Sequence, residues 1–208
     1  MHHTRPSYVS SKYCRLHSEH RQTWLTCLTR GPQQRVVSFT FYHDARVKNE
    51  KKKNFSAGIS GNLALVRRLY GAGWTMRLYY DLDPGPAGQL QLRQLCELAC
   101  ADPQLDLCRV RSLPGRPLED ASEVYPLLWR FLPTLDPQVS VFLSRDLDSR
   151  ITAREVAAVS EWLGSPGKEA VHCMRDHPEH TKPIMGGMWG ARSDTGGPGE
   201  YYLYFYSI

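Results

Sequence analysis

The sequence of 208 residues lacks any run of about 18 apolar residues, so we expect no membrane span in this chain. Its first six residues lack the apolar centre of a signal peptide, and we expect no anchor segment. The six cysteines include no CxxC pair, and the chain has no internal repeat. Because 41% of the residues are hydrophobic and 23% are charged, a globular core is expected and global disorder is excluded.

The net charge of +5 is concentrated at one end of the chain. Residues 1–53 hold 11 Lys and Arg against three Asp and Glu, whereas the remaining residues hold 15 against 18. The body of the protein is therefore close to neutral, and its overall basicity does not indicate a nucleic-acid partner. The lysines within residues 48–53 have no interleaved aromatic residues, which is typical of a solvated loop, so we expect no nucleic-acid binding.

Strand and helix patterns alternate along the middle of the chain. They predict strands over 35–42, 74–80, 105–110 and 139–143, and helices over 63–70, 89–101 and 124–132. A further helix is predicted after Thr152, which forms a capping box with Glu155. This order predicts an α/β fold with a mostly parallel sheet flanked by helices, and it predicts ligand binding at the carboxyl ends of the strands.

The chain is divided into three parts by its composition. Residues 1–34 have scattered apolar side chains at no clear period, which predicts a poorly ordered N-terminal extension. Residues 35–192 carry the alternating pattern and form the predicted domain. Residues 193–208 form a tail that is rich in aromatic residues.

Two aspartates, Asp146 and Asp148, follow the fourth predicted strand. In an extended chain, residues i and i+2 point to the same side, so both carboxylates are expected to face one point. Two hard oxygen ligands side by side suit Mg²⁺ or Mn²⁺, especially where phosphate oxygens complete the coordination shell. Arg145 and Arg150 flank the pair and are expected to balance its charge or to hold a diphosphate.

Other uses of this carboxylate pair fit the sequence less well. An EF-hand loop would need a glycine and an acidic residue where Ile151 and Ala157 stand. A phosphatase with an aspartate nucleophile places that aspartate directly on the strand, whereas Ser144 and Arg145 intervene here. Paired glycosidase carboxylates lie further apart than two residues of one turn. A solvated turn without any metal is the alternative to a metal–diphosphate site.

A glycine-rich segment follows a group of histidines near the end of the predicted domain. Zinc binding is disfavoured because the neighbouring His172 and Cys173 point to opposite faces of a strand. Gly186 and Gly187 predict backbone that must approach another group closely. Trp189 beside them is either an aromatic plate for a sugar or a buried core residue.

Three motifs occur in order along the second half of the domain. Residues 144–150 read Ser-Arg-Asp-Leu-Asp-Ser-Arg, residues 174–178 read Met-Arg-Asp-His-Pro, and residues 184–190 read Ile-Met-Gly-Gly-Met-Trp-Gly. Together they resemble a group of nucleotide-sugar transferases that have the GT-A fold. The resemblance covers residues 35–192 and is most specific in the second half.

The resemblance implies a metal-dependent glycosyltransferase that moves a sugar from a nucleotide-diphosphate donor to an unknown glycan or protein acceptor. Asp146 and Asp148 would hold the metal, Mn²⁺ or Mg²⁺, which would act as a Lewis acid on the leaving diphosphate. The other residues that the resemblance assigns to the site are Asp176 and His177 as catalytic residues; Tyr42, Asn62, Arg145, Asp146, Arg150 and Arg175 on the donor side; and Gly186, Gly187 and Trp189 on the acceptor side.

The end of the chain departs from the pattern of this family. The sequence stops at Ile208, where such domains continue with acceptor-side helices, so residues 193–208 are expected to be a truncated acceptor-side region. A non-catalytic nucleotide- or carbohydrate-binding relic of the same fold is therefore the alternative function. The resemblance points to the Golgi lumen, whereas the sequence itself leaves the compartment open. Asn54 lies in an N-glycosylation pattern that is either used there or present by chance.

Overall fold

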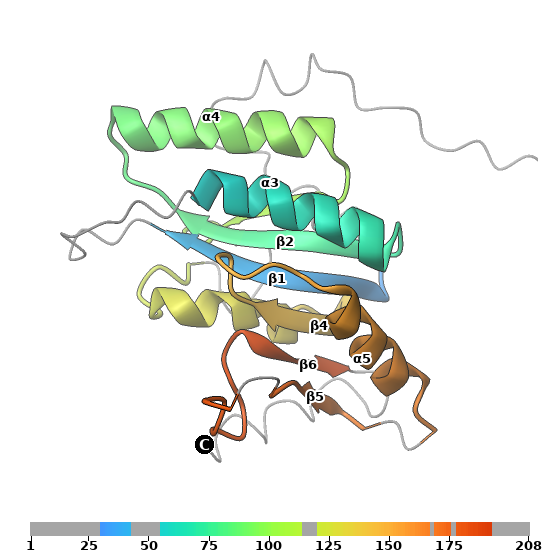
Figure 1. Ribbon diagram of the computed structural model, residues 1–208. Helices are drawn as coiled ribbons and strands as arrows, with labels where there is room; N and C mark the ends of the chain where they lie inside the picture. Colours follow the sequence, from blue (N-terminus) through green and yellow to red (C-terminus); the bar gives the residue numbers. More distant parts are fainter. Residues whose placement is uncertain (1–29, 43–54, 114–119, 167–168, 176–177, 193–208) are drawn as a thin grey trace, which may run out of the picture.

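The computed structural model describes residues 30–42, 55–113, 120–166, 169–175 and 178–192 (Figure 1). Its strands are β1 (Gln34–Tyr42), β2 (Trp74–Asp81), β3 (Leu105–Arg109), β4 (Val139–Arg145), β5 (Val171–Cys173) and β6 (Met188–Arg192). Its helices are α3 (Phe55–Leu65), the π-helix η1 (Val66–Tyr70), α4 (Pro86–Ala101), the 3₁₀-helix η2 (Pro126–Leu135) and α5 (Ala153–Gly164). No helix among the described residues has the length and apolar character needed to cross a bilayer.

These strands form one six-stranded sheet in the order β3-β2-β1-β4-β6-β5. β1 runs parallel to β2 and β4, and β2 runs parallel to β3, whereas β6 runs antiparallel to both of its neighbours. The predicted α/β class is confirmed, and the prediction of a mostly parallel sheet is right in part: the pairings among β1 to β4 are parallel, whereas β6 makes the sheet mixed. The described residues between β5 and β6 contain no crossover helix, so the chain turns back and pairs in the antiparallel sense.

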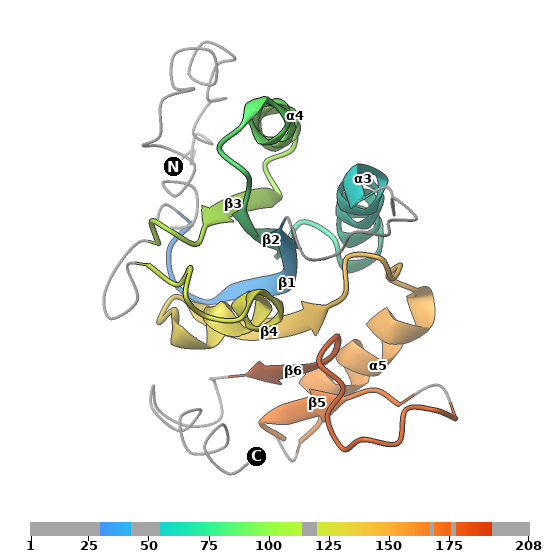
Figure 2. The ribbon, with the colours of Figure 1, turned by 90° about the vertical axis from the view of Figure 1, so that its left-hand side faces the viewer.

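Helices cover the two faces of the sheet unequally. The three α-helices lie on one face, and η2 lies on the other (Figure 2). The side chains of β1 contribute to the core on both faces of the sheet, because successive side chains of a strand point to opposite faces. Val37, Phe39 and Phe41 belong to the main core under the α-helices, whereas Val36 packs with Trp189 in a second cluster.

The helices differ more from the sequence prediction than β1 to β4 do. α3 begins at Phe55, ahead of the predicted start at 63, and its last turn continues as η1. The helix predicted over 124–132 is the 3₁₀-helix η2, which contains Pro133. Proline lacks a backbone donor and disfavours a regular α-helix at that point. The cap of α5 is confirmed, because the Thr152 hydroxyl accepts a hydrogen bond of 3.2 Å from the Glu155 amide.

Candidate functional site at the carboxyl end of β4

The predicted aspartate pair lies at the point where the order of the strands reverses. The chain runs outward from β1 through β2 to β3, and β4 then lies on the other side of β1. The last residues paired between β1 and β4 are Ser38 and Ser144, and β1 continues beyond them to Tyr42. In open α/β sheets, ligands bind in the crevice at the carboxyl ends of the strands beside such a switch point.

Asp146 and Asp148 belong to a turn between β4 and α5, not to the strand. β4 ends at Arg145, and the Ser149 amide donates a hydrogen bond of 3.2 Å to the Asp146 carbonyl. Because the chain turns at this point, the alternation rule for extended chains does not fix the two side chains. Asp148 is exposed, whereas the Asp146 side chain is 44% exposed. Both carboxylates are therefore open to solvent, but they differ in their surroundings.

Two kinds of contact hold the turn in place: apolar side chains that pack in the main core, and hydrogen bonds from Asn62 on α3. Leu147 and Ile151 belong to the main core. The Asn62 side chain has no exposed surface. Its amide nitrogen donates to the carbonyls of Leu147 and Ser149 at 3.2 and 2.9 Å, and its oxygen accepts from the Ile151 amide at 3.4 Å. Asn62 was predicted on the donor side. In the structure it is a buried residue whose hydrogen bonds hold the backbone of the turn.

The close approach of α3 to this turn depends on a glycine. A Cβ atom at Gly58 would lie 2.8 Å from the Leu147 carbonyl oxygen, which is closer than real Cβ contacts allow. One turn further, a Cβ at Gly61 would lie 3.3 Å from Nε of Arg150, which is the end of a flexible side chain. Gly58 therefore sets the distance between helix and turn, while the contact at Gly61 is adjustable.

Asp146 forms an ion pair that the motif pattern does not predict. Its carboxylate accepts a hydrogen bond from the guanidinium of Arg130 on η2. Arg130 is buried, with 7% of its surface exposed, and its Nε has no hydrogen-bond partner. The sequence signal was present, because Arg130 is the one charged residue in the apolar run from Leu127 to Leu132. A charge that folds into an apolar layer needs a counter-charge.

The Gly186–Gly187 dipeptide lies directly against this ion pair. A Cβ atom at Gly187 would lie 1.9 Å from an oxygen of Asp146, and one at Gly186 would lie 2.8 Å from Nη2 of Arg130. The Ser144 hydroxyl donates to the Gly186 carbonyl at 2.6 Å and fixes the segment beside β4. The predicted close approach of this backbone is confirmed, and the group that it approaches is the Arg130–Asp146 pair.

Arg145 points away from the aspartate pair into the interior. Its Nε donates to Glu155 at 2.7 Å, and its Nη1 donates to the Trp189 carbonyl at 3.0 Å. Tyr70 donates to the same Glu155 carboxylate at 2.9 Å, and burial together with this carboxylate raises the pKa of its hydroxyl. Arg145 was predicted on the donor side, whereas in the structure its contacts join α5 and β6 to the end of β4.

The remaining predicted residues occupy different surroundings. Arg150 and Arg175 are exposed, and Nη1 of Arg150 donates to the Leu147 carbonyl at 3.3 Å. Tyr42 is half-buried and meets Trp129 edge-on, with ring centroids 5.9 Å apart.

Trp189 is 4% exposed and packs edge-on against two phenylalanines, which is the arrangement of a core residue. It therefore presents little surface to an acceptor. Asp176 and His177, the predicted catalytic residues, lie outside the described residues, as do Asn54, the lysines within 48–53 and the chain ends 1–29 and 193–208.

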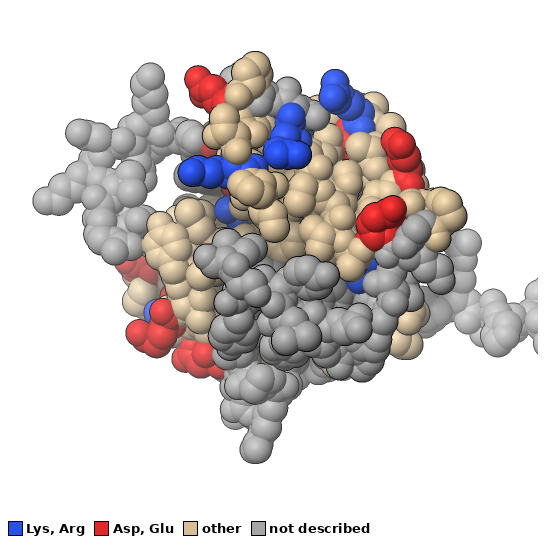
Figure 3. All heavy atoms as spheres, turned by 90° about the horizontal axis from the view of Figure 1, so that it is seen from below, with Lys and Arg blue, Asp and Glu red and all other residues tan. Residues whose placement is uncertain are grey.

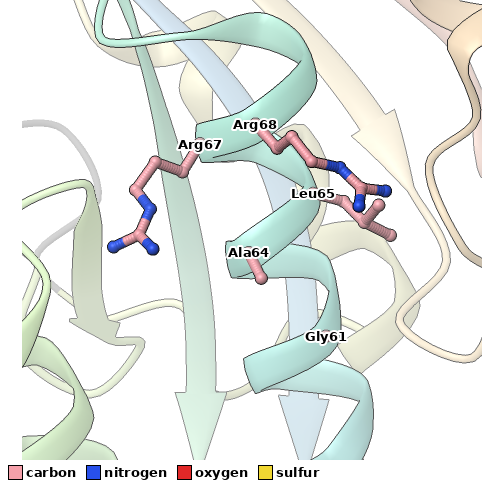
Figure 4. Close-up of a pocket in the computed structure, with 5 residues that line it drawn as sticks. All are labelled: Gly61, Ala64, Leu65, Arg67 and Arg68. Carbon is pink, nitrogen blue, oxygen red and sulfur yellow. The ribbon is translucent and has the colours of Figure 1, made fainter.

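A hollow lies along α3 and η1, and neither aspartate of the turn lines it. It is lined by Gly61, Ala64, Leu65, Arg67 and Arg68 (Figure 4). Arg67 and Arg68 point to opposite sides of the helix, and Arg67 forms an ion pair of 3.5 Å with Asp102. The hollow has a single side chain, Arg68, with charge left to offer a ligand, so it is a weaker candidate than the turn after β4.

Charges are mixed on the face that is seen from the β5 and β6 side. Acidic and basic side chains both occur there, and no field of one sign covers the described part of this face (Figure 3). Among the described residues, no group of three or more His, Cys, Asp and Glu side chains is placed to hold a metal ion. His172 stacks on Trp162 at 5.3 Å between ring centroids, so its ring has a packing role.

The fold and the turn together define an α/β protein whose switch-point edge carries two aspartates and a buried arginine. Comparison of the chain with protein families, with curated proteins and with solved structures gave no match.

Proposed function

We propose that the protein binds a nucleotide-diphosphate sugar together with a divalent cation at the turn after β4, and that it acts as a metal-dependent glycosyltransferase with a GT-A-like fold. The observation that carries the proposal is the position of Asp146 and Asp148. They leave the carboxyl end of a parallel strand beside the switch point of the sheet, where α/β proteins bind ligands. The motif resemblance supplies the nature of the ligand.

The donor groups at the turn fit Mg²⁺ or Mn²⁺. These ions prefer carboxylate oxygens, keep several waters, and are commonly bound through one or two carboxylates plus substrate phosphates. Both aspartates are open to solvent. Among the described residues no third His, Cys, Asp or Glu is grouped with the pair, so diphosphate oxygens and water would have to complete the shell. When bound there, the cation would supply Lewis-acid stabilisation of the leaving diphosphate.

Residues of the chain itself hold the turn and its aspartates in position. Asn62 holds the backbone of the turn, and Arg130 holds the carboxylate of Asp146. Holding the turn in one geometry before the ligand arrives reduces the ordering cost of binding. Under this proposal the diphosphate lies over the turn, and Tyr42 at the end of β1 lines the nucleotide side. Arg150, on the exposed end of the turn, is the cation available to the phosphates.

A calorimetric titration with UDP and with GDP tests the binding step. We expect binding of at least one of them in Mn²⁺ and none in EDTA. Asp148→Asn should weaken binding by at least an order of magnitude, or about 1.4 kcal/mol. Glu161→Gln, which removes the same charge from an exposed position on α5, is the matched control and should bind like the wild type. Equal affinity in EDTA and in Mn²⁺ would overturn the metal proposal.

The alternative function, a non-catalytic binding relic, is separated by turnover. The catalytic proposal places Asp176 beside the donor sugar, where a carboxylate assists as a general base or binds sugar hydroxyls. Asp176→Asn should then lower slow hydrolysis of the correct nucleotide sugar at least tenfold, with nucleotide affinity unchanged. Failure of every nucleotide sugar to turn over, in a protein that still binds nucleotide with Mn²⁺, favours the relic.

A further inference from the structure

We propose that Cys27 and Cys100 form a disulfide that ties the segment before β1 to the end of α4. The proposal is independent of the turn after β4 and concerns the other side of the sheet, where β3 is the edge strand. Cys27 itself lies outside the described residues. Its closeness to Cys100 is inferred from the contacts of Arg30, the first described residue of the chain.

Cys100 lies in the last turn of α4, at an exposed position. Among the described cysteines it is the one that is disulfide-bonded. The other described cysteines are thiols: Cys96, Cys108 and Cys173. Because the sequence has six cysteines, the partner of Cys100 within the chain is Cys14 or Cys27.

The contacts of Arg30 bring the segment before β1 to the end of α4. Its Nε donates to the two carboxylate oxygens of Asp106 at 3.0 and 3.1 Å, and its Nη2 donates to one of them at 2.7 Å. The same Nη2 donates to the Pro103 carbonyl. The Asp106 side chain has no exposed surface, so a buried carboxylate holds the arginine. Pro103 follows Cys100 by three residues, and Arg30 is therefore fixed close to that cysteine.

The length of chain before Arg30 distinguishes the two possible partners. Cys27 precedes Arg30 by three residues, which span at most about 11 Å in a fully extended chain. A disulfide needs its two Cα atoms about 4.4–6.8 Å apart. Cys14 precedes Arg30 by 16 residues, and closing that longer loop onto the same helix end costs more chain entropy. The anchored arginine therefore favours Cys27.

The chemistry of the two cysteines of α4 agrees with this assignment. Cys96 packs against the main core, and burial together with Glu97 raises the pKa of its thiol. The thiolate is the reactive form, so Cys96 reacts slowly, whereas Cys100 is accessible to the disulfide of a thiol–disulfide carrier. In two exchange steps the Cys27 and Cys100 thiols lose two protons and two electrons and form one S–S bond. The carrier disulfide takes up both and leaves as a dithiol.

The bond has a physical consequence for the fold. It closes a loop that contains β1, α3, β2 and most of α4. A cross-link over such a long loop stabilises a protein mainly by reducing the entropy of the unfolded chain. Because disulfides form and persist under oxidising conditions, the test uses protein that has folded under such conditions.

A disulfide map of the full chain, folded with reduced and oxidised glutathione, tests the assignment. After alkylation of the thiols, digestion without reductant should release one peptide pair that joins Cys27 to Cys100, and reduction should separate the pair. Reduction of the intact protein should lower Tm by about 5–15 °C. Cys100→Ser and Cys27→Ser should each show this lower Tm without reductant, and the double variant should have the same Tm. Cys173→Ser, at an exposed position on β5, is the matched control and should change neither the map nor Tm.

The outcomes that contradict the proposal are distinct. A peptide pair that joins Cys100 to Cys14 would overturn it, as would a bond between two chains or alkylation of both Cys27 and Cys100. An unchanged Tm after reduction would overturn the stabilising role of the bond. The map uses the wild-type chain, so it decides the assignment whether or not a variant folds. Neither measurement needs a nucleotide or a metal, so failure of the proposed function and failure of this proposal are seen separately.

Discussion

Asn62 offers the clearest test of how the turn is held. Asn62→Ala removes three hydrogen bonds to the backbone of the turn, to the Leu147 and Ser149 carbonyls and from the Ile151 amide. At about 1 kcal/mol of net stabilisation for each bond, the free energy of unfolding should fall by about 3 kcal/mol. For a protein of this size that loss corresponds to a decrease in Tm of about 6–12 °C.

Urea and thermal unfolding of the variant measure this loss. Asn62→Asp keeps an acceptor for the Ile151 amide but cannot donate to the two carbonyls, so it should destabilise the protein at least as much. Gln94→Ala removes the same amide group from an exposed position on α4 and should leave Tm within about 1–2 °C of the wild type, since surface substitutions are close to neutral. A Tm of Asn62→Ala equal to that of the control would refute the claim that the hydrogen bonds of Asn62 stabilise the turn.

Three further predictions concern close contacts and a partly buried hydroxyl. Gly58→Ala should lower the free energy of unfolding by about 1–2 kcal/mol, because its Cβ would meet a backbone carbonyl at 2.8 Å. Gly61→Ala on the same helix should be neutral or stabilising by up to about 1 kcal/mol. Urea unfolding of the two variants distinguishes these outcomes. Gly187→Ala should disturb the first aspartate of the turn and weaken Mn²⁺-dependent nucleotide binding at least tenfold, whereas Gly73→Ala, which meets nothing within 4 Å, should not. The raised pKa of Tyr70 means that its stabilisation is complete below its ordinary value of 10.0 and is lost as pH rises above that value, so unfolding experiments across alkaline pH should show a loss of stability that Tyr70→Phe reduces.

The sequence was sufficient for features that depend on local patterns. The strands β1 to β4 follow from β-branched and aromatic runs, and the cap at Thr152 follows from a residue type at a fixed spacing. The close approach at Gly186 and Gly187 was also predictable, because consecutive glycines leave room for another group. In each case the physical cause lies within a few residues of the feature itself.

Features that depend on distant partners were not predictable in the same way. The pairing of β6 between β4 and β5 is a non-local arrangement, and the sequence of β6 contains Gly190 and no β-branched residue, so it does not resemble a strand. The periodicity of a segment predicts which of its faces is apolar, but it does not predict which other element packs against that face. Arg145 and Arg130 show this limit, since the arginine beside the aspartates turned into the core and the arginine of η2 pairs with Asp146.

The most direct test of the central claim is a crystal grown with Mn²⁺ and UDP or GDP, with diffraction recorded at the manganese absorption edge. The account predicts one anomalous peak at the turn after β4, at coordination distance from carboxylate oxygens of Asp146 or Asp148 and from the diphosphate. A nucleotide seated elsewhere on the protein, or seated at this turn without manganese, would contradict the assignment.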